Sequence, residues 1–421
     1  MIRRIINSDI VKDNFILLVG TMILNLFGFL FHFYMGRSLG LEGYGILNSA
    51  LVVLYFLNVP FNTIQTGISK FSSKLKLESN IGKIKYLFSR SLRKLFLFGI
   101  IGIIIFIILV PFIADFLHID NSVLYVLSPL MVLALILPLT RGVLQGTQRF
   151  KSLSLNLASE GLIKFFIGVL FVVIGYGVYG GIGAVIASYL IAFFVGIISL
   201  RKTFNIKPVK INTKELYSYS IPLIFMITSL TCFYSIDVWL VKHYFTAEEA
   251  GLYSAVSLIG KIIFFGSLSI SQVMFPKASE LHESGKSSKS LLYKSVGIIL
   301  LFIIPMLALY FIFPNFIINV LYGADYLYIA PLVGWFGLFI ALTSLVYLIS
   351  FYKVSVNHKL FIIILWVFNI LQIVGIVLFH NSLAEVVKVL IITMFLLFVI
   401  LALNVLISKD GKTINNNTSV Q

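Results

Sequence analysis

The sequence predicts an all-α integral membrane protein with about twelve transmembrane helices. Two observations carry this prediction. Hydrophobic residues make up 59% of the chain and charged residues only 11%, and the mean hydropathy is +1.04, whereas soluble domains have about 45–50% apolar and about 25% charged residues. A membrane span needs about 20 apolar residues, so twelve spans joined by short loops account for the chain of 421 residues.

The expected spans are apolar around their whole circumference, as helices that face lipid or lie inside a bundle should be. They cover residues 14–36, 44–69, 93–114, 122–146, 153–175, 180–200, 216–242, 249–275, 292–314, 326–352, 359–380 and 383–407. No soluble domain is expected, because the longest links, near 70–92 and 276–291, are too short to build a core.

The net charge of +16 could suggest a nucleic-acid partner, but the distribution of the charge argues for membrane topology. With the N-terminus in the cytoplasm, all but six of the 32 Lys and Arg residues fall in the inner loops or the tails. The outer links are short and acidic, as the positive-inside rule requires. We therefore expect a multi-pass protein of the cell (inner or plasma) membrane with both termini cytoplasmic. Its basic loops should contact anionic lipid headgroups, and no nucleic acid is expected as a partner.

The chain contains few residues that could carry out chemistry. Its single cysteine, Cys232, permits no internal disulfide. Four of the histidines, His32, His243, His358 and His380, are scattered along the sequence, so they do not indicate a metal site. No constellation of nucleophile and base is evident. The sequence therefore predicts neither an enzyme nor a bound cofactor or metal.

An internal repeat divides the chain. The stretch from Glu42 to Ala50 aligns with the stretch from Glu248 to Val256, so that glutamate, glycine and a run of small residues coincide. We expect two six-helix lobes, residues 1–207 and residues 208–421, the second with a short polar cytoplasmic tail. Because six spans is an even number, both lobes start inside and the repeat is parallel. Transporters that are built from two repeats bind substrate at the interface of the repeats, and rocking of one repeat against the other alternates access to the two sides of the membrane.

One group of charges is expected inside the first lobe. Arg141 and Glu160 lie at similar depths in neighbouring spans, so an ion pair between them is expected. Lys164 is four residues from Glu160 and shares its helix face. A charge within a membrane span is a functional hypothesis by default, but a structural role and a substrate role both remain open for this network.

In the second lobe, Lys261 lies near the centre of its span, too deep to reach the interface easily. Counted along the helix, Asp237 is roughly 10 Å nearer the outside, which argues against a direct pair. Lys261 could bind an anionic substrate group, or it could pair with a neighbouring helix. Further candidates for the substrate path are amide side chains, which could bind sugar hydroxyls or join helices; they are Asn25, Asn62, Gln65 and Gln272. Arg37 lies near the outer end of its span, from where it can reach the interface.

Three stretches resemble the Wzx-type oligosaccharide flippases, a polysaccharide-biosynthesis family of the multidrug/oligosaccharidyl-lipid/polysaccharide (MOP) exporter superfamily. They are Gly36-Arg37-Ser-Leu-Gly40-Leu-Glu-Gly43-Tyr44-Gly45, Asp237 followed by Glu249-Ala-Gly251-Leu-Tyr253, and Phe275-Pro276. The resemblance implies a V-shaped, two-lobed transporter. It would move an oligosaccharide linked to polyprenyl (pyro)phosphate from the cytoplasmic to the outer leaflet, for O-antigen or capsule export. In related flippases cationic residues of the cavity meet the pyrophosphate or acidic sugars, and the resemblance implies Lys261 and Arg37 as the candidates by position. It also implies a polysaccharide polymerase and glycosyltransferases as partners.

Two rival functions were weighed against the flippase. A cation-coupled multidrug exporter would share the fold and would use acidic residues in its central chamber, for which Glu160 and Asp237 are available. A membrane glycosyltransferase or polymerase would need acidic residues on a large outer loop or domain. The outer links here are only a few residues long, which argues against the enzyme.

Overall fold

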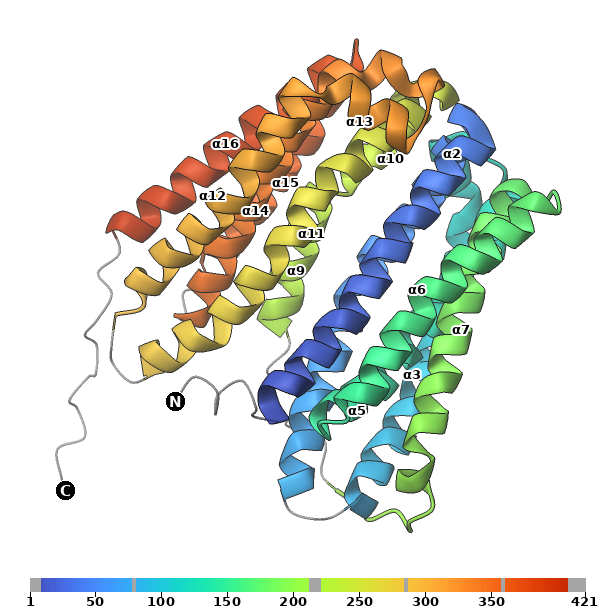
Figure 1. Ribbon diagram of the computed structural model, residues 1–421, viewed down its shortest axis with the longest axis vertical. Helices are drawn as coiled ribbons and strands as arrows, with labels where there is room; N and C mark the ends of the chain where they lie inside the picture. The colour runs from blue at the N-terminus through green and yellow to red at the C-terminus, as the bar shows by residue number, and fades with distance from the viewer. Residues whose placement is uncertain (1–8, 78–80, 212–220, 284–286, 357–359, 408–421) are drawn as a thin grey trace. The chain divides into compact units, whose positions relative to one another are not determined.

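The computed structural model describes residues 9–77, 81–211, 221–283, 287–356 and 360–407, and every regular element within these ranges is helical (Figure 1). The helices of the first half are α2 (Asp9–Leu77), α3 (Ile81–Leu117), α4 (Asn121–Leu127), α5 (Leu130–Gly146), α6 (Phe150–Val173) and α7 (Gly177–Phe204). Those of the second half are α9 (Ile221–Phe233), α10 (Ile236–Tyr244), α11 (Ala247–Glu283), α12 (Lys289–Ile312), α13 (Pro314–Leu321), the 3-10 helix η1 (Ala324–Leu332), α14 (Val333–Ser355), α15 (Phe361–Leu378) and α16 (Leu383–Ile407).

The described helices agree with the predicted spans. Ten of them are long and apolar enough to cross a membrane, and the bent pair α9–α10 makes an eleventh. The first of the ten, within α2, contains two of the predicted spans, because α2 has 69 residues and is interrupted at Gly40 by a non-helical backbone conformation (φ 70°, ψ −177°). A continuous helix of that length would measure about 100 Å, far more than a bilayer about 30 Å thick.

The two longest predicted inner links, near 70–92 and 276–291, are helical over most of their described residues. Helix α3 begins at Ile81, well before the predicted start of its span at residue 93, and α11 continues to Glu283. These extensions carry Lys83, Lys85 and Arg90, which water and headgroups can solvate. Hydropathy marks only where a helix leaves the lipid, so it underestimates helices that continue into water.

The chain forms two compact units whose borders differ from the predicted halves. One unit contains residues 1–231 and 241–254, and the other contains residues 232–240 and 255–421. Three helices therefore pass from one unit to the other, α9 after Thr231, α10 after Leu240 and α11 after Ser254. The division into lobes at residues 207 and 208 remains a prediction based on the repeat.

Helix α2 is the centre of the first unit, where it packs against α5 and α6. Two glycines spaced four apart on α5 make this contact close: a Cβ on Gly142 would lie 2.8 Å from the carbonyl oxygen of Gln65, and one on Gly146 would lie 2.3 Å from that of Ser69. Small residues at this spacing let membrane helices approach until their backbones touch. On α6, Gly161 approaches the backbone of Leu24 in the same way.

The turn between α10 and α11 is seated on the first unit by glycines that the repeat alignment pairs. A Cβ on Gly45 would lie 2.9 Å from the backbone nitrogen of Gly251, and a Cβ on Gly251 would lie only 1.9 Å from the carbonyl oxygen of Leu41. A capping box starts α11, since Thr246 and Glu249 exchange side-chain and backbone hydrogen bonds of 3.0–3.2 Å. The repeat-related turns thus contact each other directly.

The second unit is built around α14, which packs against α12, α16 and η1, while α15 packs against α16. Tyr310 joins two of its helices, because its buried hydroxyl group donates a 2.7 Å hydrogen bond from α12 to the carbonyl oxygen of Ile259 on α11. Gly337 of α14 leaves room for the same tyrosine ring, which a Cβ would approach to 2.8 Å.

The close seating of Gly251 gives a stability prediction. Gly251→Ala should lower the free energy of unfolding by about 1–3 kcal/mol, because the added methyl group overlaps the backbone of Leu41 and the turn must shift. Gly297→Ala in α12 is the matched control. A Cβ there meets nothing within 4 Å, and alanine has the higher helix propensity. Thermal unfolding of the purified variants in detergent compares them, and an equal melting temperature for both would contradict the described packing of the turn.

Candidate functional site

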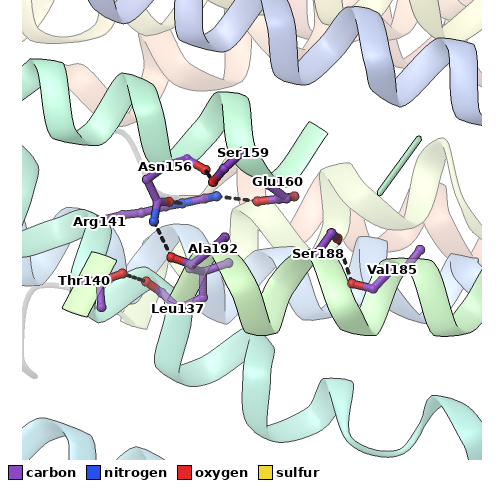
Figure 2. Close-up of polar contacts among 9 residues, drawn as sticks. All are labelled: Leu137, Thr140, Arg141, Asn156, Ser159, Glu160, Val185, Ser188 and Ala192. Carbon is purple, nitrogen blue, oxygen red and sulfur yellow. Dashed lines mark hydrogen bonds and ion pairs between the residues drawn. The ribbon is translucent and has the colours of Figure 1, made fainter. Parts of the chain in front are cut away.

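The predicted pair of Arg141 and Glu160 is present as a salt bridge in the first unit. Arg141 lies on α5 and Glu160 on α6; they are 4% and 7% exposed, and a guanidinium nitrogen of Arg141 donates a hydrogen bond to Glu160 Oε2. Figure 2 shows the arginine side chain running between α6, which carries Glu160, and α7, which carries Ala192. A charge removed from both water and lipid headgroups requires such a partner.

Asn156, which the sequence analysis did not single out, completes this network. Its side-chain oxygen accepts a 2.8 Å hydrogen bond from Arg141 Nε, and its amide nitrogen donates to the carbonyl oxygen of Ala192 on α7 (Figure 2). The guanidinium carbon of Arg141 also lies 5.5 Å from the ring centroid of Phe61 on α2, a cation–π distance. One arginine therefore ties together α2, α5, α6 and α7.

Lys164 is the third predicted member, and the structure places it beside this pair. Glu160, one helical turn earlier on α6, interacts with it electrostatically. The lysine ammonium group lies 5.6 Å from the ring centroid of Phe31 on α2. The structure therefore brings together the three charges that the sequence analysis grouped.

The second unit contains its own buried charges, Asp237 and Lys261. Asp237 is fully buried and Lys261 is 2% exposed, and the two interact electrostatically. Asp237 lies in the first turn of α10, directly after the 40° bend between α9 and α10, and Lys261 lies on α11, which follows α10 in the chain. In this structure the lysine charge is compensated by a carboxylate rather than open to solvent.

Buried amide side chains in α15 extend the polar character of this region. The Nε2 atom of Gln372 donates a 3.1 Å hydrogen bond to the carbonyl oxygen of Phe233, the last residue of α9, and satisfies one backbone group that the helix break frees. Asn369, three residues earlier, is also buried. The sequence analysis missed both residues. The available signal was two amides spaced three apart in an otherwise wholly apolar helix.

The remaining candidates fall into three groups. Arg37, Asn25 and Asn62 are exposed on α2. Gln65 donates a 3.0 Å hydrogen bond to the side chain of Gln145 on α5, which favours a role in joining helices. The side chain of Gln272 lies outside the described residues.

The chemistry available at these positions is binding by charge and by hydrogen bonds. Exposed arginine and asparagine side chains can hold anionic groups and hydroxyl groups. Among the residues that the structure describes, no group of three or more His, Cys, Asp or Glu side chains is placed to hold a metal ion.

The salt bridge predicts a strong, non-additive effect on stability. Arg141→Met should destabilise the protein by about 3–5 kcal/mol, because it leaves Glu160 buried without its cation. The double variant Arg141→Met/Glu160→Leu should recover part of that loss, since it buries neither charge of the pair, although it removes the carboxylate that also acts on Lys164. Thermal unfolding in detergent would measure both effects. A double variant that is less stable than Arg141→Met would show that the pair is not the source of the loss.

The sequence and the fold were compared with known proteins. The sequence is 26% identical over 293 residues to an uncharacterized membrane protein of Methanocaldococcus jannaschii. The aligned region covers 64% of this chain and 68% of that protein. The fold is similar to an inward-facing multidrug resistance MATE family transporter of the MOP superfamily (TM-score 0.76, 11% identity, 92% of this chain and 98% of the other). It is also similar to the lipid II flippase MurJ in an inward closed conformation (TM-score 0.68, 15% identity, 91% and 87%).

These structural similarities establish a MOP-type transporter fold. The profile of a family described as polysaccharide biosynthesis protein matches residues 34–331, which is more than half of the sequence. The chain therefore belongs to the polysaccharide biosynthesis protein family.

Proposed function

We propose that this protein is a flippase, which moves an oligosaccharide linked to polyprenyl (pyro)phosphate from the cytoplasmic to the outer leaflet by alternating access. The observation that carries the proposal is membership of a polysaccharide biosynthesis family in a chain with a transporter fold. A protein with this fold that serves polysaccharide synthesis would supply the step that soluble enzymes cannot perform, the passage of a polar glycan through lipid.

The distribution of polar side chains in the spans supports such a cargo. A lipid-linked glycan presents anionic phosphate and many hydroxyl groups, which bind to basic and amide side chains respectively. The exposed Arg37, Asn25 and Asn62 of α2 provide these types, and we include them in the substrate path. Lys261 belongs to the path only if it separates from Asp237 during transport, because in this structure the carboxylate compensates its charge.

A cation-coupled multidrug exporter is the second candidate, because a solved structure of this fold is a multidrug resistance transporter. Cation coupling needs a carboxylate that is free to bind Na⁺ or H⁺ within the membrane. Each of the two deeply buried acids in the described part of the chain already interacts with a basic side chain, Glu160 with Arg141 and Asp237 with Lys261. The flippase therefore accounts better for the charges.

The proposed setting is the cell membrane, with both termini cytoplasmic and with a polysaccharide polymerase and glycosyltransferases as partners. Topology can be tested by labelling, because Cys232 is the only cysteine and Cys232→Ser provides a cysteine-free chain. A membrane-impermeant maleimide should label Glu42→Cys and Glu249→Cys in intact cells, and Lys76→Cys only after permeabilisation. Glu42 and Lys76 are exposed, and Glu249 is partly exposed and makes an exposed hydrogen bond with Thr246. The opposite labelling pattern would invert the topology.

The function itself is tested in cells that lack the protein. Polyprenyl-linked glycans would be extracted, and their leaflet would be determined by the access of an added glycosidase in intact and in lysed cells. We expect a finished lipid-linked oligosaccharide to accumulate on the cytoplasmic side and to disappear when the gene is restored. Unchanged lipid-linked glycans together with increased sensitivity to cationic drugs would refute the flippase and favour the exporter.

A further inference from the structure

Lys164 occupies an unusual position for a basic residue. It is the fifteenth of the 24 residues of α6, a membrane-spanning helix, and it is half-buried. Nine further residues separate it from the end of the helix, which at a rise of about 1.5 Å per residue is about 14 Å. A lysine stem is too short to reach the interface from that depth, so its ammonium group must be accommodated within the membrane.

The charges around Lys164 leave one positive charge in excess. Glu160 is the nearest acid, but its carboxylate is already bound by Arg141. Glu160 acts on Lys164 electrostatically, yet neither an ion pair nor a hydrogen bond joins Lys164 to the residues that the structure describes. The other acids of the first unit whose side chains the structure describes lie at helix ends or turns; they are Glu42, Asp115, Asp120, Glu248 and Glu249. One carboxylate therefore serves two cations.

Two residues of α2, Phe31 and Gly28, lie against the ammonium group of Lys164. It lies 5.6 Å from the ring centroid of Phe31 on α2, whose negative face attracts a cation. Gly28, three residues before Phe31 on α2, faces the same ammonium group, because a Cβ there would lie 3.4 Å from Lys164 Nζ. The glycine therefore places no side chain of its own against the ammonium group, whereas a larger residue at position 28 would lie in contact with it.

We propose that Lys164 binds the phosphate of the lipid-linked substrate, with Gly28 keeping the approach open and the Arg141–Glu160 pair fixing α6 in position. This inference rests on the proposed function. A cation with a purely structural role in a membrane helix is expected to have a partner within the protein. A lysine ammonium group binds phosphate as a point charge with three donors, and phosphate would supply the negative charge that the network lacks.

The test measures binding by the full-length protein in neutral-lipid nanodiscs. The probes are a polyprenyl diphosphate, the uncharged polyprenol of the same length, phosphatidylglycerol and inorganic diphosphate. Lys164→Gln should weaken polyprenyl diphosphate binding about tenfold or more, the effect of removing a charged hydrogen-bond donor, and should leave polyprenol binding unchanged. Lys164→Arg should retain most of the affinity. Gly28→Val should weaken binding while leaving Lys164 in place.

Lys151→Gln is the matched control, because Lys151 is an exposed lysine at the start of the same helix. It should leave binding unchanged, and near-parental melting temperatures would establish that each variant is folded.

Equal affinity of the parent and Lys164→Gln for polyprenyl diphosphate would overturn the site and leave the flippase standing. Lys164-dependent binding of phosphatidylglycerol in preference to polyprenyl diphosphate would mark a site for membrane lipid and overturn the substrate assignment. Lys164-dependent binding of inorganic diphosphate without any contribution from the polyprenyl chain would do the same. A parent that does not distinguish polyprenyl diphosphate from polyprenol would count against both proposals.

Discussion

Charge within a lipid bilayer must be compensated inside the protein, and the polar interior of this molecule follows from that constraint. In the first unit Arg141 is bound by Glu160 and by Asn156, so its donors are used within the bundle. In the second unit Asp237 and Lys261 compensate each other. In both cases the partners come from different helices, so that neutralising a charge also fixes which helices lie side by side.

Close packing is the second interaction that holds the helices together, because apolar side chains gain no hydrophobic free energy when they leave lipid to contact one another. Helices must then gain van der Waals contact and backbone proximity, which glycine permits. Gly142 and Gly146 bring α5 against the backbone of α2, and Gly251 brings the α10–α11 turn against Leu41.

The sequence contained most of the fold and part of the site, for identifiable reasons. Hydropathy locates spans, and helical rise places residues at a common depth, which was sufficient for Arg141 and Glu160 because both helices are continuous there. Counting along α10 and α11 separates Asp237 from Lys261 in depth and carries no information on the sideways distance between these helices, so it could not predict that the two side chains interact electrostatically. The contact of Gln372 with the carbonyl of Phe233 joins residues 139 positions apart, which no local pattern encodes. The repeat aligned Gly45 with Gly251, but alignment does not show that they touch.

The two units differ in how completely they neutralise charge, and this difference separates structural from functional residues. A stable fold requires only that buried charges be compensated, and the second unit satisfies this with one acid and one base. The first unit has the same kind of pair and then adds Lys164, which is bound directly by no carboxylate among the residues that the structure describes. Stability alone would favour an apolar residue there, since transfer of a lysine into lipid is costly. Lys164 is half-buried, lies beside Gly28 and faces the ring of Phe31. This position is best explained by an anion that comes from outside the chain.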